Sequence, residues 1–360
     1  MKGEPTALAH MFDHSTLAQR VIFATGGAIR NISRGLEVVD SESVLVITGR
    51  SNPELARQVA ESVPAVALID QVVQHVPADR VRTATALARQ SGADSIVAVG
   101  GGSAIGLAKA VALEIGLPIV AVPTTFSGSE ATAAWGITEG RRKRTGVSER
   151  ALPRVVIYDP ELMPFEQPGF AAASGLNALA HAVDALWGPA ADPINAIFAI
   201  EAVRTLVETL RKLRESGLTL DVSEQLTFGA YLAASAFSSA GSGMHHKICH
   251  VLGGAYALPH AEMHAVVLPY VVRVNESAVP AVADRIAAIT GGRSASQDLQ
   301  ELSRSVSSSS SLAELGLREG DIAEAARRCL ELIPKSNPTP MTLGDVERLL
   351  RAAWNGESIH

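Results

Sequence analysis

Histidines gather in one part of this sequence. Six of the ten fall between positions 181 and 264: His181, His245, His246, His250, His260 and His264. Asn177 lies four residues before His181, and His246 lies four before His250; residues at that spacing share one face of a helix. A lone histidine is usually a structural residue, but this number and spacing favour a site. Imidazoles from two helices and a loop are expected to converge there, where they can bind a metal, move protons or donate hydrogen bonds.

A glycine-rich turn offers a second kind of chemistry. Gly100-Gly101-Gly102-Ser103 follows the apolar run 95–99 and precedes a helical pattern over 104–114. Glycines let backbone N–H groups approach a phosphate, and the start of a helix carries partial positive charge. These four residues are therefore expected to bind a pyrophosphate. The alternative is a plain glycine turn before a capped helix.

A hydroxyl-rich loop follows the next apolar run, 118–122. Its candidate ligand-binding residues are Thr124, Thr125, Ser127 and Ser129. Ligands of open α/β sheets collect at the carboxyl ends of the strands, so this loop and the glycine turn are expected to face one cofactor.

Arg50 bears on the choice of that cofactor. The apolar run 44–48 is followed by Gly49-Arg50-Ser51 rather than by an acidic residue. A carboxylate at this point would hold the ribose of NAD and repel the 2′-phosphate of NADP, whereas Arg50 tolerates it. Use of both NADH and NADPH is expected; the alternative is that Arg50 is a solvated surface residue.

The elements that must position these residues fall into two halves. Short β-branched runs at 43–48, 66–69, 95–99, 119–122 and 155–158 alternate with helical stretches such as 52–62 and 77–91, which predicts a mostly parallel sheet. Long helical patterns at 171–186, 193–216 and 223–240 take over after about Pro164. We predict a Rossmann-like α/β dinucleotide-binding domain over 1–163, an all-helical catalytic domain over 164–360, and a catalytic cleft between them.

Composition excludes several classes of function. A net charge of −6 and 4% aromatic residues leave neither an overall positive field nor stacking platforms, so no nucleic acid and no membrane partner is expected. The first 15 residues lack the apolar core of a secretory signal. Two cysteines 80 positions apart suggest no disulfide framework, and a cytoplasmic location is expected.

Several motifs together resemble the iron-containing (group III) alcohol dehydrogenase superfamily over nearly the whole chain. They are Gly100–Ser103 with Lys109, Pro123-Thr-Thr125 with Gly128-Ser-Glu130, and His181, His246, His250 and Pro259-His260. The resemblance implies a dehydroquinate synthase-like fold, a nicotinamide cofactor and a homodimer. By position in the family pattern, Lys143 would approach the nicotinamide ribose; in the basic run Arg141–Arg144, a solvated loop is the alternative.

Three departures from the metal-using members are similar to the maleylacetate reductases within this superfamily. Asn177 and Gly106 stand where those members have Asp, and the Thr-Thr loop is one residue shorter. A neutral amide is a poor ligand for Fe²⁺ or Zn²⁺, so no metal is expected. Without a cation the histidines are expected to protonate near pH 7 and bind an anionic, carbonyl-bearing substrate.

The activity implied is NADH- or NADPH-dependent reduction of the carbon–carbon double bond of maleylacetate to 3-oxoadipate, as in the breakdown of aromatic compounds. The expected catalytic residues are Asn177, His181, His246, His250 and His260, of which His250 or His246 is the first choice for proton transfer. One alternative is a metal-dependent alcohol or polyol dehydrogenase that tolerates Asn177. Another is a catalytically silent nucleotide-binding protein.

Overall fold

The computed structural model describes residues 12–49, 53–73, 76–139, 142–163 and 168–360. The chain divides into two compact units, Leu17–Glu166, and Met1–Thr16 with Gln167–His360. In the second, His14 Nδ1 bonds to the Asp192 carboxylate at 2.8 Å, which ties residues before the first strand to a helical segment.

A six-stranded parallel sheet forms the centre of the first unit. Its strands run in the order β1-β8-β5-β4-β2-β3 within the described residues. Their bounds are β1 (Arg20–Phe23), β2 (Val44–Thr48), β3 (Ala65–Ile69), β4 (Ser95–Gly100), β5 (Ile119–Pro123) and β8 (Val155–Tyr158). β2, β4, β5 and β8 are buried throughout, as expected for strands covered on both faces.

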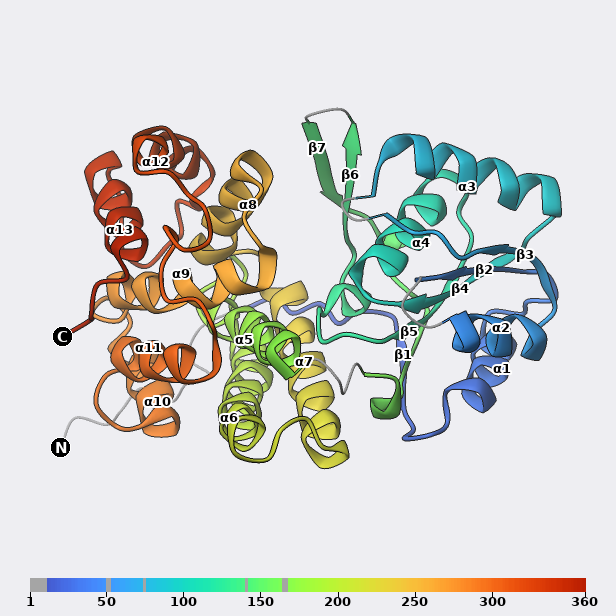
Figure 1. Ribbon diagram of the computed structural model, residues 1–360, viewed down its shortest axis with the longest axis horizontal. Helices are drawn as coiled ribbons and strands as arrows, with labels where there is room; N and C mark the ends of the chain where they lie inside the picture. The colour runs from blue at the N-terminus through green and yellow to red at the C-terminus, as the bar shows by residue number, and fades with distance from the viewer. Residues whose placement is uncertain (1–11, 50–52, 74–75, 140–141, 164–167) are drawn as a thin grey trace. The chain divides into compact units, whose positions relative to one another are not determined.

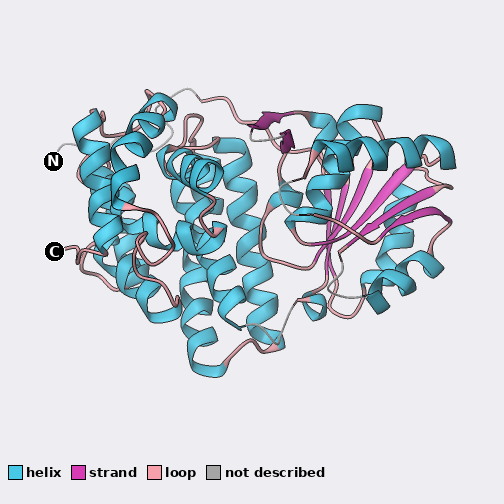
Figure 2. Ribbon diagram, turned by 45° about the horizontal axis from the view of Figure 1, so that its top comes forward, coloured by secondary structure: helices cyan, strands magenta, loops and turns pink. Residues whose placement is uncertain are grey.

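Helices cover both faces of this sheet (Figure 2). Side chains alternate along a strand, so Leu45 and Ile47 of β2 pack on one side while Val44 and Val46 pack on the other. The first side carries α3 (Ala78–Ser91) and α4 (Gly102–Ile115); the second carries α1 (Ala28–Val38) and α2 (Pro53–Ser62). The predicted mostly parallel sheet with crossover helices is confirmed.

Two features of this unit were not predicted. β1 begins the described part of the sheet and pairs with β8, more than 130 residues later. An antiparallel hairpin, β6 (Ala134–Glu139) and β7 (Arg142–Val147), stands outside the main sheet. Short 3₁₀ turns η1 (Ser129–Ala131), η2 (Glu149–Ala151) and η3 (Pro160–Leu162) complete the unit.

The second unit is helical across its described residues (Figure 1). Its helices are α5 (Pro168–Ala185), α6 (Pro193–Ser216), α7 (Leu220–Ala240), α8 (Met244–Tyr256), α9 (His260–Asn275), α10 (Pro280–Thr290), α11 (Ala295–Val306), α12 (Ile322–Leu332) and α13 (Leu343–Asn355), with η4 (Glu319–Asp321) before α12. No helix in the described part of the chain is long and apolar enough to cross a membrane.

α5 is the buried central helix of this unit. Residues 171–187 are all buried, and the helix packs against α6, α7 and α9. Small residues allow this close packing: a side chain on Gly175 would come within 3.0 Å of Leu210 on α6. Polar groups on α5 therefore lie in the protein interior, and each needs a partner there.

Candidate active site

Six histidines from three helices form one cluster. α5 supplies His181, α8 supplies His245, His246 and His250, and α9 supplies His260 and His264. Each ring lies close to at least one other ring. The distances between ring centroids are 4.7 Å for His181–His246, 4.8 Å for His246–His264, 4.5 Å for His260–His264 and 6.3 Å for His246–His250. The structure thus brings together the four histidines expected to be catalytic.

The cluster has a buried side and an exposed side. His181, His245, His246 and His264 are buried, whereas His250 and His260 are exposed. Asn177 lies one turn before His181 on α5, and its buried Oδ1 has no hydrogen-bond partner among the residues described. A small ligand would therefore meet His250 and His260 from solvent, with the other rings behind them.

Asp184 organises the ring at the centre of the cluster. This buried carboxylate accepts a hydrogen bond from His246 Nδ1 at 2.9 Å and from the backbone N–H groups of Gly243, His245 and His246 at 2.9, 3.3 and 3.4 Å. It therefore caps the start of α8 and holds the His246 ring. A donating Nδ1–H leaves Nε2 as the free nitrogen, and Nε2 has no partner within the described chain.

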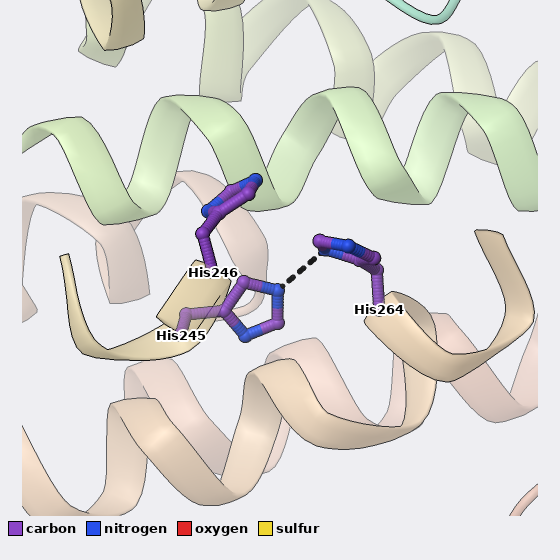
Figure 3. A group of neighbouring side chains, drawn as sticks. All are labelled: His245, His246 and His264. Carbon is purple, nitrogen blue, oxygen red and sulfur yellow. Dashed lines mark hydrogen bonds between the residues drawn. The ribbon is translucent and has the colours of Figure 1, made fainter. Parts of the chain in front are cut away.

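A second histidine pair lies beside His246. His245 Nε2 and His264 Nδ1 are 2.9 Å apart, which joins α8 to α9 (Figure 3). One of these nitrogens must carry the proton and the other must accept the hydrogen bond, so the tautomers of the two rings are coupled. In Figure 3 the three rings point into one space between their helices.

The predicted protonation of the histidines near pH 7 is wrong for the buried members in the free protein. Burial, with smaller contributions from neighbouring histidines, lowers the pKa of His181 and of His245 to about 3. The pKa of His246 and that of His264 are also shifted well below their usual value, mainly by burial. An imidazolium loses its hydration in this interior, so these rings are neutral at pH 7.

The ring nitrogens of the cluster are possible ligands for a metal ion. His245, His246 and His264 offer one ring nitrogen each, all within 4.8 Å of one another. The group contains no carboxylate, the Asn177 amide adds no charge, and Asp184 already accepts four N–H groups. Three imidazoles can supply nitrogen ligands to a divalent metal, but this set leaves the double charge of a buried Fe²⁺ or Zn²⁺ uncompensated and lacks the carboxylate of a three-histidine, one-carboxylate site.

The glycine turn lies at the start of α4, in the α/β unit. Gly100 ends β4 with a positive φ of 147°, where a side chain would come within 2.9 Å of Ala104 Cβ. Gly101 is the N-cap of α4 and supplies no side-chain cap, and Gly102 and Ser103 form the first turn. The N–H groups at this helix start have no capping side chain from the turn itself, which suits an anion.

The hydroxyl-rich loop lies against this turn. β4 and β5 are in register, with Gly100 opposite Pro123, so both loops leave the sheet side by side. A side chain on Gly101 would come within 2.9 Å of Thr125 Cγ2, and one on Gly102 within 3.8 Å of Ser127 Oγ. Thr125 Oγ1 and Ser127 Oγ are buried and have no partner in the described structure.

A second glycine turn in this unit differs from the first because its N–H groups are already paired. Gly26 and Gly27 lie between β1 and α1, but Asp159 at the end of β8 accepts the N–H groups of Gly26 and Ala28 at 2.8 and 2.9 Å. A carboxylate of the chain itself thus occupies the start of α1. Of these two glycine turns, the one before α4 is the better phosphate site.

The structure describes only some of the remaining residues that were predicted to bind the cofactor. Thr124 donates its N–H to Gly100 O at 3.2 Å, which joins the loop to the turn. Ser129 begins η1, and its carbonyl accepts from the Lys109 ammonium at 2.6 Å. Lys143 lies on β7, but its side chain is outside the described residues. Arg50 lies outside them entirely.

Sequence reasoning missed part of the histidine cluster. It gave no role to Asp184, and it left His245 and His264 out of the expected catalytic set. Two signals were present: Asp184 follows His181 by three residues, and His264 follows His260 by four. Both spacings place the later residue on the same helix face as the earlier one.

Two family patterns match this chain. The iron-containing alcohol dehydrogenase pattern covers residues 18–160, and the pattern for the C-terminal part of the Fe-containing alcohol dehydrogenase family covers residues 171–354. Among curated relatives, the maleylacetate reductase of Pseudomonas sp. (strain P51) is 40% identical over 351 residues, which are 96% of this chain and 98% of the relative.

Solved structures agree with this relationship. An iron-containing alcohol dehydrogenase from Corynebacterium glutamicum is 46% identical with a TM-score of 0.93, covering 97% of this chain and 98% of its own. The maleylacetate reductase from Agrobacterium tumefaciens is 33% identical with a TM-score of 0.92, covering 97% and 100%. The chain belongs to the iron-containing alcohol dehydrogenase family.

Proposed function

We propose that this protein uses NADH or NADPH to reduce the carbon–carbon double bond of maleylacetate, giving 3-oxoadipate, without a metal. The observation that carries the proposal is the six-histidine cluster, beside which Asn177 presents a neutral amide in place of a carboxylate. Its similarity to maleylacetate reductases over 96% of the chain supports the choice of substrate. The resemblance also implies a cytoplasmic homodimer.

We propose a division of labour between residues 1–163 and 164–360. The N–H groups of Gly100, Gly101, Gly102 and Ser103 bind the cofactor phosphates, with the hydroxyls of Thr124, Thr125, Ser127 and Ser129 beside them. Lys143 contacts the nicotinamide ribose, and Arg50 tolerates a 2′-phosphate. The helical residues bind the substrate. The uncapped start of α4 and the two unpartnered hydroxyls of the loop support this assignment.

In the proposed reaction the bound cofactor supplies a hydride to the alkene carbon β to the ketone. The alkene electron pair shifts to join the α carbon to the carbonyl carbon, the carbonyl π pair moves onto the ketone oxygen as an enolate, and protonation of the α carbon gives the product. His246 is the central group, because Asp184 accepts its Nδ1–H and leaves Nε2 to face the substrate, where Nε2 becomes a donor once the ring takes up a proton. His181, His250 and His260 surround the substrate oxygens, and Asn177 adds an amide.

Substrate binding and protonation are coupled in this scheme. The buried imidazoles are neutral in the free protein because burial lowers their pKa. A dicarboxylate brings negative charge among them and raises that pKa, since an opposite charge within about 4–6 Å favours the protonated form. The cluster therefore takes up protons with its substrate and can release one to the enolate carbon.

The experiment that tests this proposal is an NADH oxidation assay with maleylacetate on chelator-treated protein. We expect turnover to survive metal removal and to be unaffected by added Fe²⁺ or Zn²⁺. A metal-dependent alcohol dehydrogenase is the second candidate, favoured by the name of the 46% identical Corynebacterium structure. Absence of maleylacetate reduction, together with alcohol oxidation that returns when Fe²⁺ or Zn²⁺ is added, would establish that candidate instead.

A further inference from the structure

A fully buried lysine is hydrogen-bonded to the hydroxyl-rich loop at Ser129. Lys109 is on α4, two turns after the glycine turn, and is 1% exposed. Lysine is almost never buried to this degree unless its ammonium is fully paired. Burial lowers its pKa to about 7, and the charge of Glu130 opposes that shift. Desolvation thus disfavours the ammonium at this position, and the hydrogen bonds of Nζ are what offset that cost.

The ammonium has three acceptors for its three N–H groups. Lys109 Nζ donates to Ser129 O at 2.6 Å, to Thr132 Oγ1 at 3.1 Å and to Ala134 O at 2.7 Å. These acceptors span the six residues from η1 to the start of β6. One side chain on α4 therefore fixes the course of this segment, and an amide or hydroxyl could not supply three donors at that point.

Two further side chains hold the segment through Glu130. Tyr158 OH donates to Glu130 Oε1 at 2.8 Å, and Gln19 Nε2 donates to Glu130 O at 2.8 Å. In the same loop, a few residues earlier, the hydroxyls of Thr125 and Ser127 lie against Gly101 and Gly102 without partners among the residues described. The loop is thus anchored after Ser129, while its unpaired hydroxyls lie before that anchor.

We infer that Lys109 is a positioning residue of the cofactor site, which sets Thr125 and Ser127 against the glycine turn by holding Ser129–Ala134. This inference rests on the proposed function, because it takes the ligand of the turn to be the nicotinamide dinucleotide. A buried ammonium is a weak source of stability, since an apolar side chain of similar volume often serves the fold as well. Its three directed bonds are what a positioning role requires.

The test measures NADH binding to the full-length Lys109→Met variant by fluorescence titration. Methionine keeps an unbranched apolar stem and removes all three donors. We expect the Kd for NADH to rise by about 10- to 100-fold, the usual effect of losing a residue that orients a binding group. The kcat at saturating NADH and the KM for maleylacetate should change less than about threefold, because the histidine cluster is untouched.

Two further variants separate positioning from folding. Thr132→Val removes one of the three acceptors and should raise the NADH Kd by a smaller factor; added to Lys109→Met, it should have no further effect. Thr209→Val removes a buried hydroxyl bond of 2.6 Å in the helical unit and serves as the stability control. Its thermal stability should fall without any change in NADH affinity.

The outcomes are distinct. A Kd within twofold of wild type in both Lys109→Met and Thr132→Val overturns the inference, whatever happens to thermal stability. If Lys109→Met fails to fold, Thr132→Val alone decides by the same criterion. NADH binding by the wild-type protein without maleylacetate reduction refutes the proposed function but leaves the positioning role of Lys109 open to the same measurement. Failure of the wild-type protein to bind NADH refutes both.

Discussion

Replacing Asp184 by Asn should separate activity from stability. The carboxylate holds the His246 ring through Nδ1 at 2.9 Å and accepts three backbone N–H groups. An amide of the same size has one acceptor atom. Its oxygen can replace Oδ2, which receives the His246 ring and two of the N–H groups, but the neutral amide supplies no negative charge to stabilise the His246 ring when it is protonated. We expect kcat for maleylacetate reduction to fall by about 10- to 100-fold, or roughly 1.4 to 2.7 kcal/mol in the barrier.

The stability of this variant follows from the pKa of the carboxyl. Burial raises it from 3.8 to about 6, against the opposing effect of the N–H donors. At pH 7, above both values, the fold therefore disfavours the ionised carboxylate by about 3 kcal/mol relative to the unfolded chain. A neutral amide removes this cost, whereas loss of an acceptor for the His245 N–H destabilises the fold by about 1 kcal/mol. Thermal stability should be unchanged or higher.

The assay is NADH oxidation at saturating cofactor, with thermal unfolding and NADH titration on the same preparation. Asp298→Asn is the matched control: Asp298 is a buried carboxylate in the helical unit that accepts hydrogen bonds from Thr290 and, at 2.8 Å, from the Arg293 side chain rather than from a histidine. It should change stability without lowering kcat. A kcat within threefold of wild type in Asp184→Asn would refute a catalytic contribution of the Asp184 charge, and a fall in kcat explained by unfolding would reduce Asp184 to a structural role.

Three further outcomes are expected. The free energy of unfolding should fall as the pH is lowered from 7 to 5. His181 and His245 have a pKa of about 3 in the folded protein and about 6.5 in the unfolded chain, so only the unfolded chain takes up protons in this range. Each histidine should therefore lower the free energy of unfolding by about 2 kcal/mol at pH 5. Urea unfolding at both pH values measures this, and a pH-independent midpoint would contradict it. Gly101→Ala should raise the NADH Kd about tenfold (1.4 kcal/mol), because its Cβ would lie 2.9 Å from a methyl carbon of the facing loop; Gly254→Ala, which meets no atom within 4 Å, should not. Asn177→Asp should raise Zn²⁺ affinity, measured by calorimetry, and lower maleylacetate reduction; unchanged affinity would count against our account of the missing carboxylate.

The sequence by itself determined most of the elements and much of the candidate site. Strand and helix periods are local, so the runs around Val97 and Val120 and the helix 193–216 are readable without a fold. The same local periodicity placed His246 and His250 on one helix face. Glycines followed by a helical pattern likewise indicated the turn before α4. Each of these signals lies within a few residues of the chain.

Tertiary structure alone decided which groups meet and in what state. Strand β1 carries no strong period of its own and forms because it pairs with β8, far along the chain. Asp184 and His246 are 62 residues apart, and Lys109 reaches acceptors 20 to 25 residues away, so no spacing rule joins them. Burial decided the rest: histidines expected to be protonated near pH 7 are neutral, because α5, α8 and α9 enclose them and exclude the water that would stabilise their charge.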